Sequence, residues 1–400
     1  MSVFTSEQWK AIRKELNHNP EDYGVPRRVY GSAVVGSFNI RKLGSVTKRN
    51  RNTWHFLADM CRHFDLLAIQ EVMNDTGGLR HLVSLMGDQF DLIVSDTTGA
   101  FPDKKGLDER LAYIYNRNLF QLRGVITDVT WDRTQVLQTL VENFPAFAQA
   151  IQPVAGKKGV SAGEIRKIKM PTFLAFIRTP FAAEFEVFGH PRAERFPFMA
   201  INAHLNFGKF ISDREQEFDA LLKWMIGKVR EEETVHARNI LLLGDLNLNY
   251  DSPERDHPVL VEKLRALNNK VGRKVNVCAP FLDPHPQSMQ LMAKTGGAFR
   301  TNARLSETFD QIAILSRDER LGSLSTNQMG RDPRGPDFGV IDFVNLFAKA
   351  VMGKASADSL SKEEKKEFFK KFEHKVSDHM PLWFRFRLPD EPEGQVSLAP

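Results

Sequence analysis

The chain has few of the features that mark secreted, membrane-spanning or zinc-stabilised proteins. Its 400 residues include only two cysteines, Cys61 and Cys278, which excludes a disulfide scaffold and a cysteine-rich zinc site. No run of 18 consecutive apolar residues occurs, so we expect no transmembrane helix. The N-terminal sequence, which begins MSVFTSEQWK, lacks the apolar segment of a secretory signal. Together these absences favour a reducing compartment and a cytoplasmic location.

A large charge imbalance is also missing. The chain has 55 Lys and Arg against 50 Asp and Glu, a net charge of +5, which is compatible with a polyanionic partner without demonstrating one. Apolar residues make up 42% of the chain, enough for a large core, and 30 of them are phenylalanines. The length alone would suggest two or three domains of about 150 residues each. The sequence contains no internal repeat and no long linker.

Short apolar runs alternate with helical patterns along the whole chain. Residues 54–64 and 213–229 carry apolar side chains at helical spacing, which predicts two amphipathic helices. Apolar runs of about 4–8 residues predict buried strands. These runs lie at residues 33–38, 66–69, 92–94, 111–115, 173–177, 198–203, 240–243, 311–315 and 381–386. The alternation favours a layered α/β fold.

Three stretches look like elaborations outside the core, at residues 135–167, 249–299 and 331–375. The last of them contains a run of mixed charges at residues 362–375. We interpret this run as a solvated helix that directs Phe368, Phe369 and Phe372 inward.

Polar side chains recur where the predicted strands end. One such residue is unremarkable, but six strand ends in one chain argue for a shared site, because loops converge at strand ends in α/β folds. The residues at these ends are Asn39, Glu71, His204, Asn206, Asp245, Asn247, Asp310, Asp378 and His379.

These residue types suit the hydrolysis of a phosphate ester. Oxygen ligands from Glu, Asp and Asn favour Mg²⁺, Mn²⁺ or Ca²⁺ over zinc. Two histidines can act as acid and base near neutral pH, because an unperturbed imidazole has a pKa of about 6.5. A metal ion, a base for water and an acid for the leaving oxygen are the parts that such a reaction needs.

Eight segments, which lie between residues 33 and 386, resemble motifs of the endonuclease/exonuclease/phosphatase superfamily and most closely its deoxyribonuclease I-like branch. They occur in the order of that family: FNIRKLG (38–44), LLAIQEV (66–72), DERLAYIY (108–115), KMPTFLAF (169–176), INAHLN (201–206), LLLGDLNLN (241–249), TFDQIAI (308–314) and VSDHMPL (376–382). The resemblance implies a four-layer α/β sandwich of two packed, mostly antiparallel sheets flanked by helices. We expect one domain over residues 31–388, because motifs from both ends must meet in one site. A helical extension would precede it at 1–30, and a polar tail would follow at 389–400.

The resemblance also implies a metal site and a pair of catalytic histidines. Mg²⁺, with Mn²⁺ or Ca²⁺ as alternatives, would be bound by Glu71 as a direct ligand together with Asn39 and Asp378. The histidines would be His204 and His379, one of which removes a proton from the attacking water while the other protonates the leaving oxygen. The sequence does not assign the two roles.

Further residues would orient these groups or bind substrate. By resemblance, Glu109 and Asp310 would orient the two histidines, and Asp245 and Asn247 would orient the water and hold the phosphate. The substrate-binding residues would be Arg41, Lys169 and Asn206.

Simpler interpretations stay open for several of these residues. Asn39 and Asn247 also suit ordinary turns, Asp245 suits a helix N-cap, and Glu109 suits an exposed loop. The basic segment at residues 41–55 either grips phosphate beside the site or is a solvated loop; its cations are Arg41, Lys42, Lys48, Arg49 and Arg51.

The most direct functional hypothesis is a Mg²⁺-dependent DNA endonuclease. The substrate stays open, because Met73 departs from the branch pattern and the three elaborations have no counterpart there. The first alternative is a phosphatase or phosphodiesterase that acts on a lipid, inositol or other small phosphate through the same site. The second is a non-catalytic subunit whose elaborations bind a protein partner.

Overall fold

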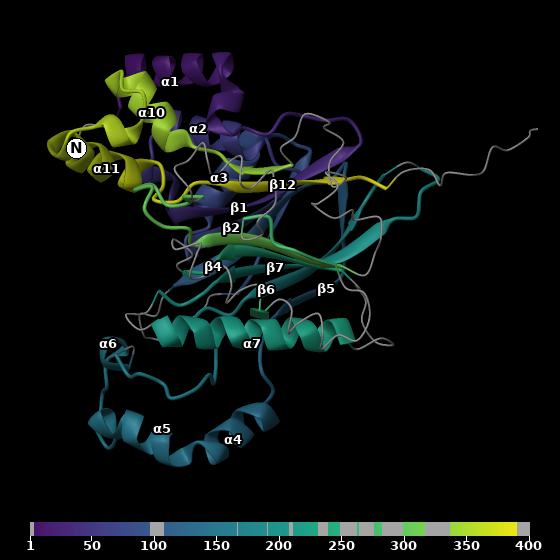
Figure 1. Ribbon diagram of the computed structural model, residues 1–400, viewed down its shortest axis with the longest axis vertical. Helices are drawn as coiled ribbons and strands as arrows, with labels where there is room; N and C mark the ends of the chain where they lie inside the picture. Colours follow the sequence, from purple (N-terminus) through teal and green to yellow (C-terminus); the bar gives the residue numbers. More distant parts are fainter. Residues whose placement is uncertain are drawn as a thin grey trace, which may run out of the picture.

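The computed structural model shows an α/β protein built on two six-stranded sheets (Figure 1). It describes residues 4–96, 108–165, 167–189, 191–207, 211–230, 239–248, 262–263, 276–281, 299–316 and 337–389. The strands are β1 (Ser32–Leu43), β2 (Leu66–Met73), β3 (Phe90–Val94), β4 (Glu109–Asn116), β5 (Phe120–Asp128), β6 (Phe181–Val187), β7 (Phe196–His204), β8 (Ile240–Asp245), β9 (Asn276–Cys278), β10 (Asp310–Ser316), β11 (Phe338–Val340) and β12 (Leu382–Arg387).

Both sheets are mixed and mostly antiparallel. The first sheet has the order β11-β12-β1-β2-β4-β3, and the second has the order β5-β6-β7-β8-β10-β9. Among the strand pairs that the structure describes, only β1–β2 and β7–β8 are parallel. Each sheet therefore contains one pair of strands whose carboxyl ends lie together.

The two sheets pack face to face through alternate side chains of their strands. In β1, Val35 belongs to the apolar layer between the sheets, whereas Val34 lies on the opposite face, under helices. In β8, Leu243 faces the first sheet and Leu242 packs on the helix side. Because successive side chains of a strand point to opposite faces, both faces of each sheet are buried.

Helices cover the two outer faces (Figure 1). On the first sheet they are α1 (Ser6–His18), α2 (Arg51–Cys61), α3 (Gly77–Met86), α10 (Phe343–Met352) and α11 (Lys362–Lys375), and on the second sheet α7 (Ile211–Arg230). The layers are thus helix, sheet, sheet and helix, which confirms the four-layer α/β sandwich expected from the sequence.

Helix α11 delivers the chain to the site and starts from a capping box. Ser361 Oγ accepts a hydrogen bond from the backbone N–H of Glu364, whose side chain accepts one from the N–H of Ser361. Phe368 and Phe372 are buried in the core and Phe369 packs against it, as predicted for this charged run. The helix ends directly before the segment that carries Asp378 and His379.

Several sequence expectations differ from the structure. Residues 173–177 do not form a strand; they lie in an irregular segment in which Phe173 contacts Trp131 and Phe176 edge to face. The strand of this region is β6, which begins at Phe181 and whose buried Glu184 interrupts its apolar pattern. The expectation that residues 331–375 lie outside the core is wrong for their described part, where β11 joins the first sheet and α10 is buried.

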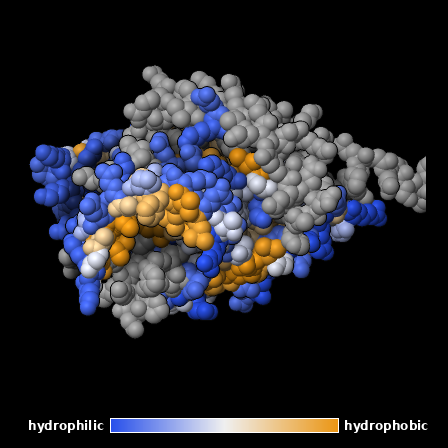
Figure 2. Space-filling view, turned by 90° about the horizontal axis from the view of Figure 1, so that it is seen from below, coloured by the Kyte–Doolittle hydropathy of each residue, from blue (hydrophilic) through white to orange (hydrophobic). Residues whose placement is uncertain are grey.

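The stretch at 135–167 forms a peripheral arm of helices α4 (Arg133–Glu142), α5 (Phe144–Ile151) and α6 (Ala162–Ile165). Figure 1 shows this arm beyond α7, away from the sheets. Helix α4 has no buried residue, and Val141 and Phe144 are 76% and 66% exposed. Figure 2, which views this side, shows a band of apolar surface over the arm. Most of the stretch at 249–299 and all of 390–400 lie outside the described residues.

Both cysteines, Cys61 and Cys278, are buried. Among the described helices, none combines the length and the apolar character needed to cross a bilayer.

Candidate active site

Three neighbouring strands of the second sheet place acid–base side chains in one row. His204 pairs with Asp245 in the β7–β8 ladder, and Asp310 pairs with Asp245 in the β8–β10 ladder. Residues paired across a sheet lie side by side. In each strand alternate side chains face the other sheet, and His204, Asp245 and Asp310 lie on that same face, at the end of the strand where the apolar core stops. Each is at most 3% exposed.

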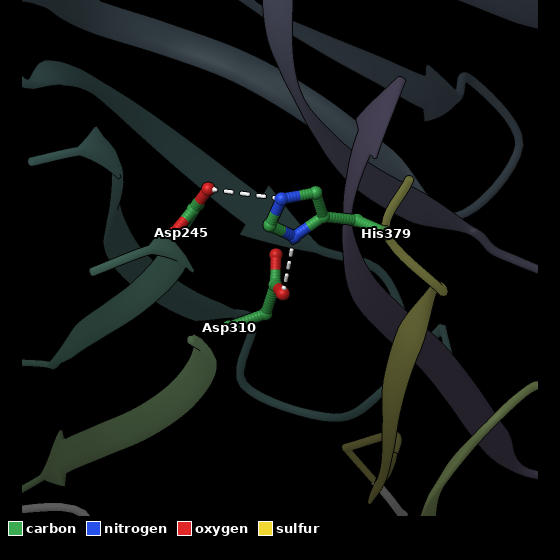
Figure 3. Close-up of side chains that lie close together, drawn as sticks. All are labelled: Asp245, Asp310 and His379. Carbon is green, nitrogen blue, oxygen red and sulfur yellow. Dashed lines mark hydrogen bonds and ion pairs between the residues drawn. The ribbon is translucent and has the colours of Figure 1, made fainter. Parts of the chain in front are cut away.

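His379 joins this row from the segment between α11 and β12. Its Nδ1 lies 2.8 Å from Asp310 Oδ2, and its Nε2 lies 3.5 Å from Asp245 Oδ2 (Figure 3). Burial opposes a charge on the ring, but the carboxylates of Asp310 and Asp245 outweigh it and raise the pKa of His379 well above its usual value.

His204 has a carboxylate partner of its own. Its Nδ1 lies 3.4 Å from Glu109 Oε2 at the start of β4. The Arg178 guanidinium donates hydrogen bonds to both carboxylate oxygens of Glu109 and, at 3.2 Å, to the carbonyl of Leu205. Burial would raise the pKa of Glu109, but His204 and Arg178 lower it to about 2. Glu109 is therefore an anion facing His204 and not an exposed loop charge.

The two histidines flank one carboxylate oxygen. His204 Nε2 lies 3.6 Å from Asp245 Oδ2, the same atom that His379 Nε2 approaches. Asn39 Nδ2 donates to this oxygen at 3.0 Å, which links the first sheet to the second. The N–H of Asn247 donates to the other oxygen, Oδ1, at 3.0 Å. Burial favours the neutral acid, yet the histidines and these hydrogen bonds lower the pKa of Asp245.

A second group of oxygens lies beside this row, where the registers of both β1 against β2 and β2 against β4 shift. The β2 register against β4 shifts between Ile69 and Val72, and Glu71 in this bulge has a left-handed φ of 58°. Left-handed backbone is costly for a residue other than glycine, and bulges re-aim side chains. Here Glu71 Oε2 accepts the N–H of Lys42 at 2.9 Å, and Asn39 Nδ2 lies 3.4 Å from Glu71 Oε1.

Asp378 completes this group of oxygens. Its Oδ2 lies 3.0 Å from Arg41 Nη1. Burial raises the pKa of Asp378; His379 lowers it and the carboxylate of Glu71 raises it further, and the net shift is upward. The buried Oδ1 atoms of Asp378 and Asn39 have no hydrogen-bond partner among the described residues.

These residues fit a hard divalent cation. Two unpartnered buried oxygens and two repelling carboxylates would both be stabilised by such an ion, and carboxylate and amide oxygens are its preferred ligands. Ligand atoms of Asp245, Asp310 and His379 also lie within 4.8 Å of one another. However, both ring nitrogens of His379 already face carboxylates, which favours acid–base chemistry for this second trio.

Ten of the twelve predicted site residues lie in this connected group, although their catalytic roles stay predictions. They are Asn39, Arg41, Glu71, Glu109, His204, Asp245, Asn247, Asp310, Asp378 and His379. Asn206 borders the group, and its N–H donates to Glu217 Oε2 at 2.7 Å. Lys169 is exposed in the segment between α6 and β6, and its contact with DNA stays a prediction.

Arg49 does not lie in a solvated loop. It is 8% exposed, donates to the carbonyls of Arg41 and Val376, and lies over the Trp54 ring at 5.7 Å. Burial lowers its pKa to about 10. Burial and these two hydrogen bonds, which Nη2 donates to β1 and to the segment after α11, disfavour the interpretation in which Arg49 grips phosphate.

Sequence reasoning missed two buried charged residues at the site, Arg178 and Glu217. Arg178 contacts Glu109 from the segment just before β6, and Glu217 lies on α7. The available signal for Arg178 was an arginine directly preceding a Thr-Pro pair and an apolar strand. No pattern in α7 distinguishes Glu217 from the charged residues around it.

A buried amide pair also joins the sheets beneath the site. Gln70 Nε2 donates to Asn202 Oδ1 at 2.7 Å, and Asn202 Nδ2 donates to the carbonyls of Ile69 and Ala112. Buried polar groups with satisfied hydrogen bonds favour one relative position of the packed elements. This pair therefore fixes how the row on the second sheet faces Asn39 on the first.

Comparison with known proteins gives matches only among solved structures. No protein-family model matches the chain, and no curated protein matches it. An endonuclease/exonuclease/phosphatase family protein from Bacteroides thetaiotaomicron is 13% identical, with 91% of this chain and 98% of that chain covered and a TM-score of 0.44. The human Nocturnin catalytic domain with bound sulfate anion is 12% identical, with 90% and 96% covered and a TM-score of 0.45. The D. rerio TDP2 complexed with single strand DNA product is 13% identical, with 89% and 99% covered and a TM-score of 0.41. The solved structures similar to this chain thus include proteins named for the family that its motifs resemble.

Proposed function

We propose that this chain is a divalent-metal-dependent phosphodiesterase of the endonuclease/exonuclease/phosphatase superfamily, and that it cleaves DNA as an endonuclease. One observation carries the proposal. The Nε2 atoms of His204 and His379 both face Oδ2 of Asp245, beside a group of oxygens suited to a hard cation. The deoxyribonuclease-like motifs and the net positive charge support DNA as the substrate.

The carboxylate partners prepare each histidine for proton transfer. Asp310 and Glu109 lie on the Nδ1 side of His379 and His204, at 2.8 and 3.4 Å. A carboxylate there holds a proton on Nδ1 and leaves Nε2 directed toward the reacting atoms. One histidine then accepts the proton of the attacking water and the other donates a proton to the leaving oxygen. Each positioned group contributes about 10²–10⁴-fold to the rate.

The remaining side chains orient the water and the phosphate. Asp245 is a carboxylate between the two histidines, where it can accept a hydrogen bond from the attacking water. Asn247, with a left-handed φ of 52°, holds Asp245 through its backbone N–H. Mg²⁺, Mn²⁺ or Ca²⁺, when bound, supplies Lewis-acid stabilisation of the charge that develops on a non-bridging phosphate oxygen. Asn39, Glu71 and Asp378 would hold it.

The test is cleavage of supercoiled plasmid, linear duplex and single strands by the purified protein, with and without Mg²⁺. We expect nicking of the supercoiled plasmid that stops in chelator and returns when Mg²⁺ is added. Glu71→Gln should abolish the response to Mg²⁺, whereas Glu363→Gln, at an exposed position of α11, should not change it. Equal cleavage in chelator, or no cleavage of any nucleic acid, would contradict the proposal. Release of phosphate from inositol or lipid phosphates in the latter case would reassign the substrate.

A further inference from the structure

Glu217 is a buried carboxylate that the proposed mechanism does not use. It lies in α7 and is 6% exposed. Its Oε1 accepts a hydrogen bond from the backbone N–H of Ile177 at 2.7 Å, and its Oε2 accepts one from the backbone N–H of Asn206 at 2.7 Å. Each oxygen therefore binds a different segment of the chain, one just before β6 and one just after β7.

Both segments carry parts of the candidate site. Ile177 directly precedes Arg178, whose guanidinium binds Glu109 and the carbonyl of Leu205. Asn206 follows Leu205, which in turn follows His204. The Leu205 carbonyl also accepts the side-chain N–H of Asn247 at 2.8 Å. A shift of either segment would move Arg178 relative to Glu109, or Glu109 relative to His204.

We propose that Glu217 is a positioning residue of the phosphodiesterase, which holds residues 177–178 and 205–206 so that Arg178, Glu109 and His204 stay aligned. The catalytic part of this inference rests on the proposed function. The structural part, a carboxylate that joins two segments by their backbone N–H groups, stands on the hydrogen bonds alone.

A carboxylate suits this place because both groups that face its oxygens are donors. Glutamine has only one side-chain oxygen, so its amide N–H₂ would face one of the two backbone N–H groups and leave that donor unpaired. Burial raises the pKa of Glu217 to about 7, although the two backbone N–H groups, Arg178 and His204 lower it. Among the residues that the structure describes, Arg178 in the segment before β6 and His204 in β7 are the charged or titratable side chains that act on Glu217.

Protonation of Glu217 should therefore weaken its hydrogen bonds to the N–H groups of Ile177 and Asn206. Below a pH of about 7 one oxygen of Glu217 carries a hydrogen and can no longer accept a backbone N–H well, and above it both oxygens accept. The alignment of Arg178 with Glu109 is then strongest on the alkaline side of neutrality.

The first experiment measures amide hydrogen exchange of the full-length protein, in peptides that contain Ile177 and Asn206. In the wild type, protection of these amides, corrected for intrinsic exchange, should rise as the pH increases from 6 to 8. In Glu217→Gln, protection should fall at least about fivefold and no longer depend on pH over this range. Glu215→Gln, which changes an exposed carboxylate of the same helix, is the matched control and should behave as the wild type.

The second experiment measures hydrolysis of bis(p-nitrophenyl) phosphate in Mg²⁺ over the same pH range. Glu217→Gln should lower kcat about 10–100-fold with little change in KM, because a misaligned acid–base pair affects chemistry more than binding. Unchanged exchange at both amides would overturn the inference, and so would an unchanged kcat with altered exchange. If Glu217→Gln does not fold, a flat pH dependence of exchange in the wild type overturns it. If Glu217→Gln alters exchange but the wild type hydrolyses no phosphodiester, the proposed function is refuted and the two hydrogen bonds of Glu217 keep their structural role.

Discussion

Asp310→Asn is the sharpest single test of the site, because it removes a charge and almost no volume. Asp310 is fully buried, and its Oδ2 lies 2.8 Å from His379 Nδ1. A hydrogen bond to a charged group contributes about 1.5–3 kcal/mol, and each 1.36 kcal/mol of activation free energy is about tenfold in rate. We therefore expect kcat to fall about 10–150-fold on any phosphodiester that the protein cleaves.

Stability should respond differently. Burial raises the pKa of Asp310, His379 lowers it and Asp245 raises it, and the net shift is upward. A carboxyl group with a raised pKa contributes stability below its unfolded pKa, and this contribution is lost as the pH rises through the folded value. The neutral asparagine side chain of the variant avoids that loss, and His379 can release its proton so that no unpaired charge stays buried. The Tm at neutral pH should therefore stay within about 5 °C of the wild type.

The pH profile gives a further check that does not depend on which histidine is the acid. Without Asp310 the pKa of His379 should fall, so whichever limb of the kcat profile reports this residue should move to lower pH. Asp342→Asn is the matched control, because Asp342 caps α10 by accepting the N–H of Asn345 far from this site in the chain. An Asp310→Asn protein that keeps kcat within about twofold of wild type, with an unshifted profile, would refute the reasoning.

Four other substitutions test separate parts of the structure. His204→Ala and His379→Ala should each lower plasmid cleavage at least about 100-fold, and near-normal activity in either purified variant would remove that histidine from the mechanism. Arg49→Ala should lower the Tm but leave the salt dependence of DNA binding unchanged, whereas a flatter salt slope would restore the phosphate-binding interpretation. Glu109 has a pKa of about 2 against a usual 4.5, so the stability that it contributes is present above pH 4.5 and lost as the pH falls toward 2. Glu109→Gln should reduce this part of the acid unfolding, followed by circular dichroism. An unchanged acid transition would contradict the ion pair with Arg178.

Much of the site could be predicted because it continues the strand pattern of the sequence. Val35 and Asn39 share one face of β1, and Leu243 and Asp245 share one face of β8. A polar residue that lies an even number of positions beyond an inward-facing apolar residue of the same strand therefore points into the same space between the sheets, at the rim of the apolar core. The sequence could not show that His204, Asp245 and Asp310 are in register, because register is set by the pairing of strands that are distant in the chain.

The charged residues whose surroundings were misjudged from the sequence have partners that no local pattern indicates. Arg178 lies 69 positions from Glu109, and Arg49 donates to the carbonyl of Val376, 327 positions away. Burial of a charge is decided by such partners and not by its neighbours in sequence. Lys169 lies in a motif of the resemblance, and its contact with DNA stays a prediction; the arginine that contacts Glu109 stands nine positions later and lies in no such motif.

Glu71 shows why a local pattern can find a candidate site residue and still miss its backbone conformation. Strict alternation along β2 would place Gln70 between the sheets and Glu71 on the helix side. Gln70 does lie between the sheets, where it donates to Asn202, and Val72 packs on the helix side. The register can hold both only if Glu71 is the extra residue of a bulge, and its left-handed φ of 58° is the conformational cost. The bulge takes Glu71 out of the regular ladder at the carboxyl end of β2 and places its carboxylate beside Asn39, in the position that the proposed metal site requires.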